Sequence, residues 1–215
     1  MKLALIIVFT IGLLAFVLFY FTTDRPTDAV QVNLPWQVIV HDAEHSEVFG
    51  IVLNQTTLEQ ARQQFGQLDG LALFKNEQGE YSLEAYFGKV TIGPFSARLI
   101  ANLDVPQDEL ERLTEHSVKR ITTQQGSVRW TLTPQKQTEQ GLHRIRSLTY
   151  IPGYSGMDAA FIEQRFGTPG RRKSVDETTE LWFYPQQGVR IMIDSEGKEM
   201  FEYSAPAQFE TSLGD

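Results

Sequence analysis

Cysteine is absent from the 215 residues of this sequence. Its absence excludes disulfide bonds, thiolate zinc sites, a cysteine nucleophile and a lipid-modified N-terminal cysteine. Cations are also in the minority, with 19 Lys and Arg against 27 Asp and Glu and a formal net charge of −8. Because a general nucleic-acid binder needs a basic face that displaces counterions from phosphates, this balance argues against nucleic acid as a partner.

The common motifs of catalysis and cofactor binding are missing as well. We find no glycine-rich phosphate loop, no nucleophile elbow and no helical zinc motif. His41 and His45 are four residues apart beside several carboxylates, but they fall in a predicted hairpin turn. In a turn this spacing does not bring two imidazoles onto one metal. The sequence therefore predicts no catalytic residues, no cofactor and no metal site.

One long uncharged stretch is present at the start of the chain, over residues 3–21. As an α-helix it would be about 28 Å long, close to the hydrocarbon thickness of a bilayer. The alternative, a cleaved signal peptide, usually has a shorter apolar region and a small-x-small cleavage site. We therefore predict a transmembrane anchor over 1–22, which contacts the membrane through residues 3–21, and a polar tether over 23–35.

The few charges that flank this stretch set its expected orientation. Lys2 lies before the stretch, and Arg25 follows it between two aspartates. The positive-inside rule then places the N-terminus in the cytoplasm and the C-terminal domain in the periplasm. The predicted localisation is the bacterial inner membrane, crossed once.

After the tether, the same order of elements occurs twice. A β-rich hairpin over 36–53 precedes a helix that starts near Thr56, whose spacing to Glu59 is that of a capping box. A second helix covers 157–166, and both helices end in Phe-Gly. Glycine often ends a helix, because it adopts a backbone conformation that other residues resist. Gly66 and Gly167 are therefore predicted to be structural residues.

Alternating apolar residues predict the strands that surround these helices. They fall at 71–75, 81–87, 97–105, 127–133, 142–151, 180–184, 189–193 and 200–203, with a bridging helix at 108–117. The predicted fold class is α+β, an N-terminal transmembrane helix followed by a tandem duplication of a helix packed on an antiparallel sheet. The domains are a first repeat with its bridging helix over 36–118, a second repeat over 119–206 and a tail over 207–215. A single irregular α+β domain is the alternative.

The second repeat resembles the BamE (SmpA/OmlA) family of small envelope lipoproteins and, more broadly, the fold of β-lactamase inhibitory proteins. The resemblance covers about residues 150–204 and rests on the following segments: Gly156-Met157-Asp158, Ile162, Phe166-Gly167-Thr168-Pro169, Leu181-Trp182-Phe183-Tyr184, Gly188-Val189 and Asp194 to Gly197. It implies structural roles for Gly156, Pro169 and Trp182. The family is usually anchored by lipid on a cysteine, which this chain lacks, so the resemblance supports the fold more than the function.

Two groups of residues are candidate binding sites. The first is the apolar segment with Phe87, Ile92 and Phe95, which glycines and a proline interrupt; a loop this apolar can dock a partner. The second is the basic set at the end of the second helix, which suits an acidic partner or a lipid headgroup: Arg165, Arg171, Arg172 and Lys173. The alternatives are an irregular pair of core strands for the first group and helix-capping cations for the second.

The function predicted from these features is that of a membrane-tethered periplasmic protein-binding or scaffold protein of the bacterial cell envelope. It would act through contacts with envelope proteins, and not as an enzyme. The alternative is a module that binds a small ligand, a lipid or a peptidoglycan fragment.

Overall fold

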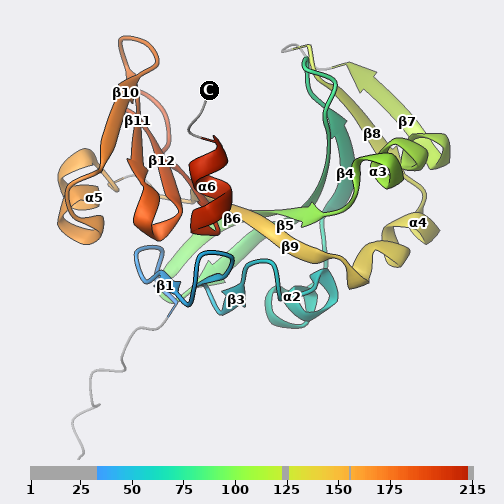
Figure 1. Ribbon diagram of the computed structural model, residues 1–215, viewed down its shortest axis with the longest axis horizontal. Helices are drawn as coiled ribbons and strands as arrows, with labels where there is room; N and C mark the ends of the chain where they lie inside the picture. The colour runs from blue at the N-terminus through green and yellow to red at the C-terminus, as the bar shows by residue number, and fades with distance from the viewer. Residues whose placement is uncertain (1–32, 123–125, 155, 213–215) are drawn as a thin grey trace, which may run out of the picture. The chain divides into compact units, whose positions relative to one another are not determined.

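A ten-stranded antiparallel sheet forms the centre of the computed structural model, which describes residues 33–122, 126–154 and 156–212. The order of its strands is β10-β11-β12-β13-β9-β6-β5-β4-β8-β7 (Figure 1). In chain order they are β4 (Gly70–Lys75), β5 (Tyr81–Ile92), β6 (Phe95–Asp104), β7 (Ser117–Thr122), β8 (Val128–Leu132), β9 (Arg144–Pro152), β10 (Arg171–Ser174), β11 (Thr179–Tyr184), β12 (Val189–Asp194) and β13 (Met200–Ser204).

Smaller elements surround this sheet. A second sheet has three short strands, β1 (Ile39–Val40), β2 (Ser46–Val48) and β3 (Ile51–Val52). The helices are α2 (Leu58–Phe65), α3 (Gln107–Leu113), α4 (Pro134–Glu139), α5 (Ala159–Phe166) and α6 (Pro206–Ser212). Single 3-10 turns follow α3, α4 and β11: η1 (Thr114–His116), η2 (Gln140–Leu142) and η3 (Pro185–Gln187).

Local capping explains where α2 and α5 begin and end. Thr57 accepts a hydrogen bond from the Gln60 amide while the Gln60 side chain accepts one from the Thr57 amide, so the capping box lies one residue later than predicted. Asp158 caps α5 in the same position. Gly66 and Gly167 end the two helices with φ of 93° and 83°, a region that other residues enter with strain. The structural roles predicted for these two glycines are consistent with this geometry.

The core lies between one face of the ten-stranded sheet and the elements that cover it, which are α2, α3, α5 and the three-stranded sheet. Phe65 of α2 packs on Phe87 of β5 at a ring distance of 5.6 Å, and Phe166 of α5 packs on Phe201 of β13 at 5.9 Å. Side chains alternate along each strand, so every second residue reaches this face. We call it the outer face, and the opposite face, which carries Glu84 and Thr149, the inner face.

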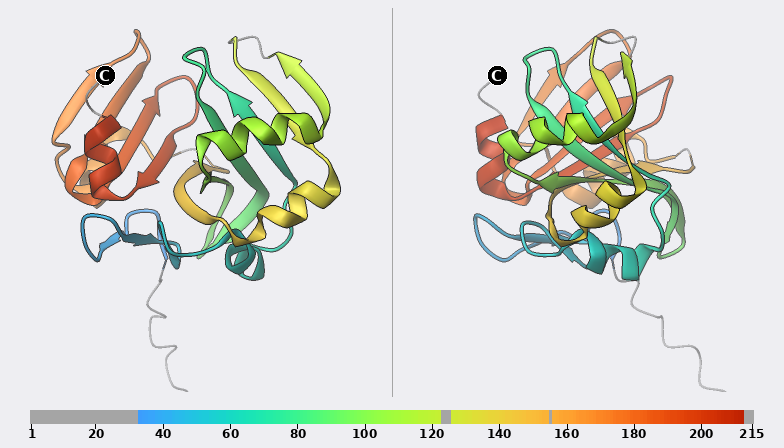
Figure 2. Two further views of the ribbon diagram at one scale, coloured as in Figure 1. Left: turned by 45° about the vertical axis from the view of Figure 1, so that its right-hand side comes forward. Right: turned by 90° about the vertical axis from the view of Figure 1, so that its right-hand side faces the viewer.

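The helix α6 lies on the inner face, on the other side of β6 and β9 from α2 and the three-stranded sheet (Figures 1 and 2). Phe209 of α6 is buried against Phe183, whose register partner Arg190 lies on the inner face. The amide of Ala207 donates to the Ala43 carbonyl at 2.9 Å, which ties α6 to the β1–β2 turn. The sheet also bends, so that β4 and β11 rise on the side of β9 where α6 lies (Figure 1).

The predicted fold class is wrong in its main feature. The strands of the two predicted repeats do not form two sheets, because β9 pairs with β6 on one side and with β13 on the other. The protein is mostly β, with its described strands in one large and one small sheet. The limits predicted for the two repeats stay a prediction, although β7 and β8, at the proposed boundary, extend the sheet beyond β4.

The transmembrane part of the prediction also needs correction. The helix expected over 3–21 lies outside the described residues, and within them no helix has the length and apolar character needed to cross a bilayer. The single-pass anchor, the contact with the membrane through residues 3–21 and the inner-membrane localisation that depends on them are therefore not supported.

Candidate functional site

A cavity of about 480 Å³ lies on the inner face of the sheet, bounded on one side by α6. This volume is within the range of sites that hold small ligands, roughly 300–1,000 Å³. Its lining comes from five strands and one helix: Glu84, Ile100, Asn102, Arg146, Ser147, Thr149, Arg190, Met200, Glu202, Tyr203, Ser204, Gln208 and Phe209.

Strand register explains why these residues meet. Tyr86, Ile100, Thr149, Glu202 and Arg190 are successive partners across β5, β6, β9, β13 and β12. Directly paired residues point to the same face of a sheet, so this row crosses the inner face without interruption. A parallel row places Glu84, Asn102, Ser147 and Ser204 side by side. The cavity is thus built from residues far apart in sequence.

Two of the charged groups in the cavity are paired. Arg190 donates from Nε to Glu202 Oε2 at 2.7 Å and also contacts this oxygen through Nη2. The Tyr86 hydroxyl donates to Glu84 Oε2 at 2.5 Å. Burial raises the pKa of Glu84; the Tyr86 hydrogen bond and the charge of Arg129 oppose this shift, and Glu202 adds to it.

Arg146 has no such partner. Among the described residues it forms no ion pair or hydrogen bond through its side chain, and the side chains of Asn102, Ser147 and Thr149 likewise form no hydrogen bond there. The cavity therefore contains one guanidinium and three polar side chains that can still form hydrogen bonds with a ligand.

The inner face as a whole is cationic, although the chain is acidic. Register places on it more cations than carboxylates among the described strand residues. The cations placed by register are Lys89, Arg98, Lys119, Arg129, Arg144, Arg171, Lys173 and Arg190, and the carboxylates are Glu84, Asp104, Asp194 and Glu202. Arg146, which lines the cavity, is a further cation on this face. Half-exposed apolar side chains lie between these cations: Ile100, Ile151, Leu181, Met192 and Met200.

The predicted apolar binding segment is part of the sheet. It forms the adjacent ends of β5 and β6, and the turn between them contains Gly93. Phe87 and Ile92 are each only 3% exposed, so they are not available to a partner in this conformation. Phe95 is half-buried; its ring stacks on Tyr154 at 5.0 Å and meets Trp36 edge-to-face at 6.0 Å.

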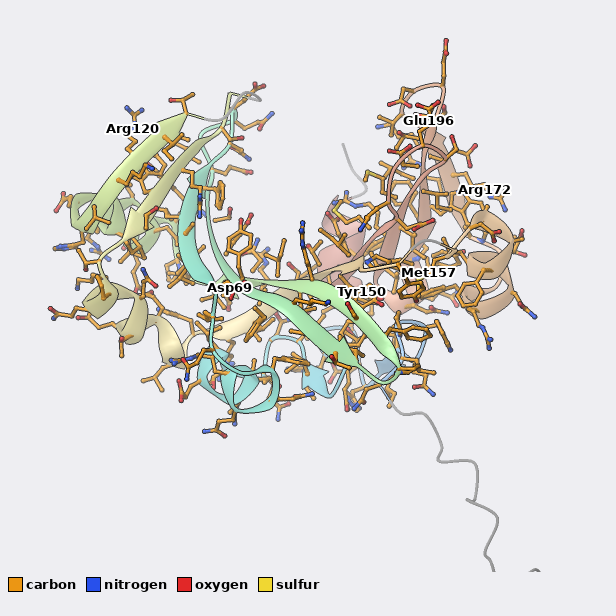
Figure 3. All side chains as sticks on the ribbon, turned by 180° about the vertical axis from the view of Figure 1, so that it is seen from behind. Asp69, Arg120, Tyr150, Met157, Arg172 and Glu196 are labelled. Carbon is orange, nitrogen blue, oxygen red and sulfur yellow. The ribbon has the colours of Figure 1, made fainter. Side chains whose placement is uncertain are left out.

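The predicted basic set is divided between the two faces. Arg172 lies on the outer face, 4.0 Å from the Trp182 ring centroid and 3.3 Å from a Glu163 oxygen (Figure 3 shows it beside α5). Arg171 and Lys173 lie on the inner face, where Arg171 stacks over Phe183 at 5.5 Å.

The fourth member of the set, Arg165, lies 4.9 Å from the centroid of Trp36. Phe95 contacts the same indole, so Trp36 links the two predicted groups. Pairing with aromatic rings and Glu163 accounts for Arg165, Arg171 and Arg172 as structural cations. Their proposed binding role, and that of Phe95 and Lys173, stays a prediction.

The other predicted structural residues lie at positions that suit a glycine, a proline and a buried tryptophan. Gly156 has φ of 117°, and Pro169 is half-buried just after α5. Trp182 is 2% exposed and donates from Nε1 to Glu180 at 2.8 Å.

In the hairpin turn, His41 contacts Glu47 at 3.1 Å and His45 contacts Asp42 at 2.9 Å. Within the described residues no cluster of three or more metal-ligating side chains occurs.

The cavity residues were not identified from the sequence. The alternation of Leu99, Ala101 and Leu103 predicts a buried face, and the opposite set, Ile100 and Asn102, lines the cavity. That complementary alternation is the signal that could have indicated a polar sheet face. Arg146 carries no such signal, because its position depends on an irregularity in strand pairing.

Comparison with known proteins gives no relative: no family model, no curated protein and no solved structure matches this chain. The resemblance to the BamE family and to β-lactamase inhibitory proteins therefore stays a prediction.

Proposed function

We propose that this chain is a protein-binding module that docks an acidic surface of a partner protein on the inner face of its ten-stranded sheet. The observation that carries the proposal is the segregation of charge. A chain with a net charge of −8 concentrates cations on one sheet face, where they surround half-exposed apolar side chains and a cavity. Complementary charge of this kind steers association and selects partners, while exposed apolar groups supply the contact area.

The aliphatic character of this face favours protein over nucleic acid. Sheets that bind single-stranded RNA or DNA present free aromatic rings on which bases stack. Here the apolar side chains between the cations are mostly isoleucine, leucine and methionine. Each inner-face ring already has a partner: Arg129 lies over Phe74 at 5.9 Å from the ring centroid, Phe183 is buried beside Phe209, and Tyr86 is hydrogen-bonded to Glu84. An acidic protein surface with apolar side chains matches both features.

The test is site-specific photo-crosslinking from both faces. A photoreactive residue at Arg98, exposed on the inner face, is compared with one at Arg112, exposed on α3. We expect a partner protein to be captured from position 98 and not from position 112. Affinity for this partner should fall in Lys89→Glu/Arg98→Glu and remain unchanged in Arg112→Glu. Equal capture from both positions, or equal affinity of both variants, would contradict the proposal.

The volume of the cavity supports a second candidate function, the binding of a small ligand. In that case a small molecule would co-purify with the chain, and charge reversal at Lys89 and Arg98, which lie outside the cavity lining, would leave it bound.

A further inference from the structure

Arg146 reaches the cavity because of a β-bulge. In the pairing of β6 with β9, Asn102 is opposite Ser147 and Leu103 is opposite Ile145, so Arg146 is an extra residue without a partner. Ile145 and Leu148 on either side are buried on the outer face. A bulge re-aims one side chain and often lies next to a functional site. Here it adds a guanidinium to a face that regular alternation would give to Ser147 alone.

The groups around Arg146 select the kind of ligand. Two cations, Arg146 and Arg190, and two carboxylates, Glu84 and Glu202, line the cavity, and Arg190 is paired with Glu202. Arg129 lies near Glu84 outside the lining, and with its charge counted against that carboxylate the charge of Arg146 is left over. The two carboxylates would repel a doubly charged phosphate. A singly charged carboxylate fits, since a guanidinium binds it through two parallel hydrogen bonds. Asn102, Ser147 and Thr149 can donate further hydrogen bonds to its oxygens.

We propose that the cavity is a carboxylate-recognition site in which Arg146 binds an aspartate or glutamate side chain of the partner protein. That the carboxylate comes from a partner protein rests on the proposed function. That the cavity binds a carboxylate does not. The partner's carboxylate enters between Arg146 on β9 and the polar side chains of β6 and β9, next to the wall formed by α6. The apolar members of the cavity, Ile100 and Met200, contact the methylene groups of the same side chain.

The experiment uses isotope-labelled full-length chain and follows the arginine Nε–H signals by NMR during titration. The first probe is N-acetylglutamate N-methylamide, whose single carboxylate is on the side chain. The second is the glutamine analogue, which has the same shape and no charge. The third is N-acetylalanine, which carries a main-chain carboxylate, and the fourth is inorganic phosphate.

We expect the glutamate probe to shift the Arg146 signal and to bind more tightly than the other three. Arg146→Gln should weaken its binding by about tenfold, the loss that corresponds to one charge-assisted interaction. Arg98→Gln removes the same charge from the same face outside the cavity and should change the affinity by less than about twofold.

Several results would overturn the inference. Equal binding of the glutamate and glutamine probes would exclude recognition of charge, and equal losses in Arg146→Gln and Arg98→Gln would indicate a diffuse surface effect. Tighter binding of N-acetylalanine would assign the site to a chain terminus, and tighter binding of phosphate would assign it to another anion. Absence of any shift at the solubility limit would also overturn it.

The two experiments together distinguish failure of the carboxylate site from failure of the proposed docking face. A partner that is captured from position 98 and bound independently of Arg146 would leave the docking face in place without the carboxylate site. Glutamate binding that depends on Arg146, together with no captured partner, would do the reverse.

Discussion

The Tyr86 hydroxyl donates a 2.5 Å hydrogen bond to Glu84 Oε2, between two residues that are two positions apart on the same face of β5. Burial raises the pKa of both side chains, and the pair faces Arg129 of β8 and Glu202 of β13. The cavity residues Arg146 of β9 and Arg190 of β12 complete its charged surroundings. A carboxylate in this position is held in place by its neighbours but is less stable as an ion than it would be in water.

Glu84 should therefore reduce the stability of the fold at neutral pH. Its pKa in the folded state is raised above 4.5, so the folded state holds the proton more tightly than the unfolded state. Stability is then highest below the unfolded pKa and is lost as pH rises through the folded pKa. We expect Glu84→Gln to raise Tm at pH 7, with a difference that shrinks as pH falls through the folded pKa and is smallest below the unfolded pKa of about 4.5.

Thermal unfolding from pH 4 to pH 8 measures this difference, and Glu196→Gln in the exposed β12–β13 turn is the control. A Glu84→Gln variant that is less stable than the parent at pH 7, with a loss that grows as pH rises, would show that the carboxylate is stabilising and would contradict the prediction. In the NMR titration, the glutamate probe should bind more tightly to Glu84→Gln than to the parent chain, because a negative charge has been removed from the cavity.

Tyr203 and Tyr150 offer a matched test of buried hydroxyls. Both rings are fully buried, at 1% and 0% exposure. The Tyr203 hydroxyl donates to the Pro35 carbonyl at 3.0 Å, whereas the Tyr150 hydroxyl has no partner with hydrogen-bond geometry in the described residues. Burial, followed by the nearby Tyr154, raises the pKa of Tyr150, so the two hydroxyls are close without being well aligned.

Tyr203→Phe should lower the free energy of unfolding by about 1–3 kcal/mol, because it leaves the buried Pro35 carbonyl without a donor. Tyr150→Phe removes an unsatisfied buried group and should be neutral or stabilising. Urea denaturation of both variants measures the difference. Equal losses in the two variants would mean that the Tyr150 hydroxyl has a partner of comparable strength.

Local rules account for the parts of the fold that the sequence predicted. Gly66 and Gly167 end helices because glycine enters the left-handed region without strain, and Leu99 and Ala101 are buried because they alternate. The core strands were therefore found close to their observed limits. The edge strands β7 and β10 were missed, since β10 reads Arg171-Arg172-Lys173-Ser174 and is exposed throughout, which leaves no alternation to detect.

Long-range pairing accounts for the rest. No local pattern indicates that β9 has partners on both sides, and it is this pairing that merges two predicted sheets into one. The bulge at Arg146 and the position of α6 in the predicted tail also depend on contacts distant in sequence. The glycines near Phe87 and Ile92 are compatible with an apolar loop or with an irregular pair of core strands. The structure has the second arrangement, because a bulge at Gly88 lets the strand continue.

Gly188 and Gly66 separate backbone strain from steric clash. Both have positive φ, at 66° and 93°. A Cβ on Gly188 would lie 2.0 Å from the Ser204 carbonyl oxygen, whereas a Cβ on Gly66 would meet nothing within 4 Å. We expect Gly66→Ala to lower the free energy of unfolding by about 1–3 kcal/mol, the strain of a backbone conformation that is almost confined to glycine, with no clash added.

Gly188→Ala should lower it by about 3 kcal/mol or more, because β12 and β13 must also move apart. Chemical denaturation compares the two variants at one pH. Similar losses would show that the η3 turn relaxes freely away from Ser204.

The charged residues of the cavity differ in what they do for the fold, and this difference can be measured without a ligand. Arg190 is paired with Glu202, and their side chains are 38% and 30% exposed, so the pair should contribute about 0.5–1 kcal/mol. Arg146 has no partner, so Arg146→Gln should change the free energy of unfolding by less than about 0.5 kcal/mol.

Two double-mutant cycles measure how strongly Glu202 is coupled to Arg190 and to Arg146. Arg190→Gln combined with Glu202→Gln should show a coupling energy of about 0.5–1 kcal/mol, and Arg146→Gln combined with Glu202→Gln should show none within error. Raising the salt concentration should reduce the first coupling and leave the second unchanged. Comparable coupling in both cycles would mean that Glu202 also neutralises Arg146. The cavity would then have no spare positive charge for a carboxylate. If Arg146 is uncoupled, it adds nothing to the stability of the fold, as expected of a residue that is there to bind a ligand.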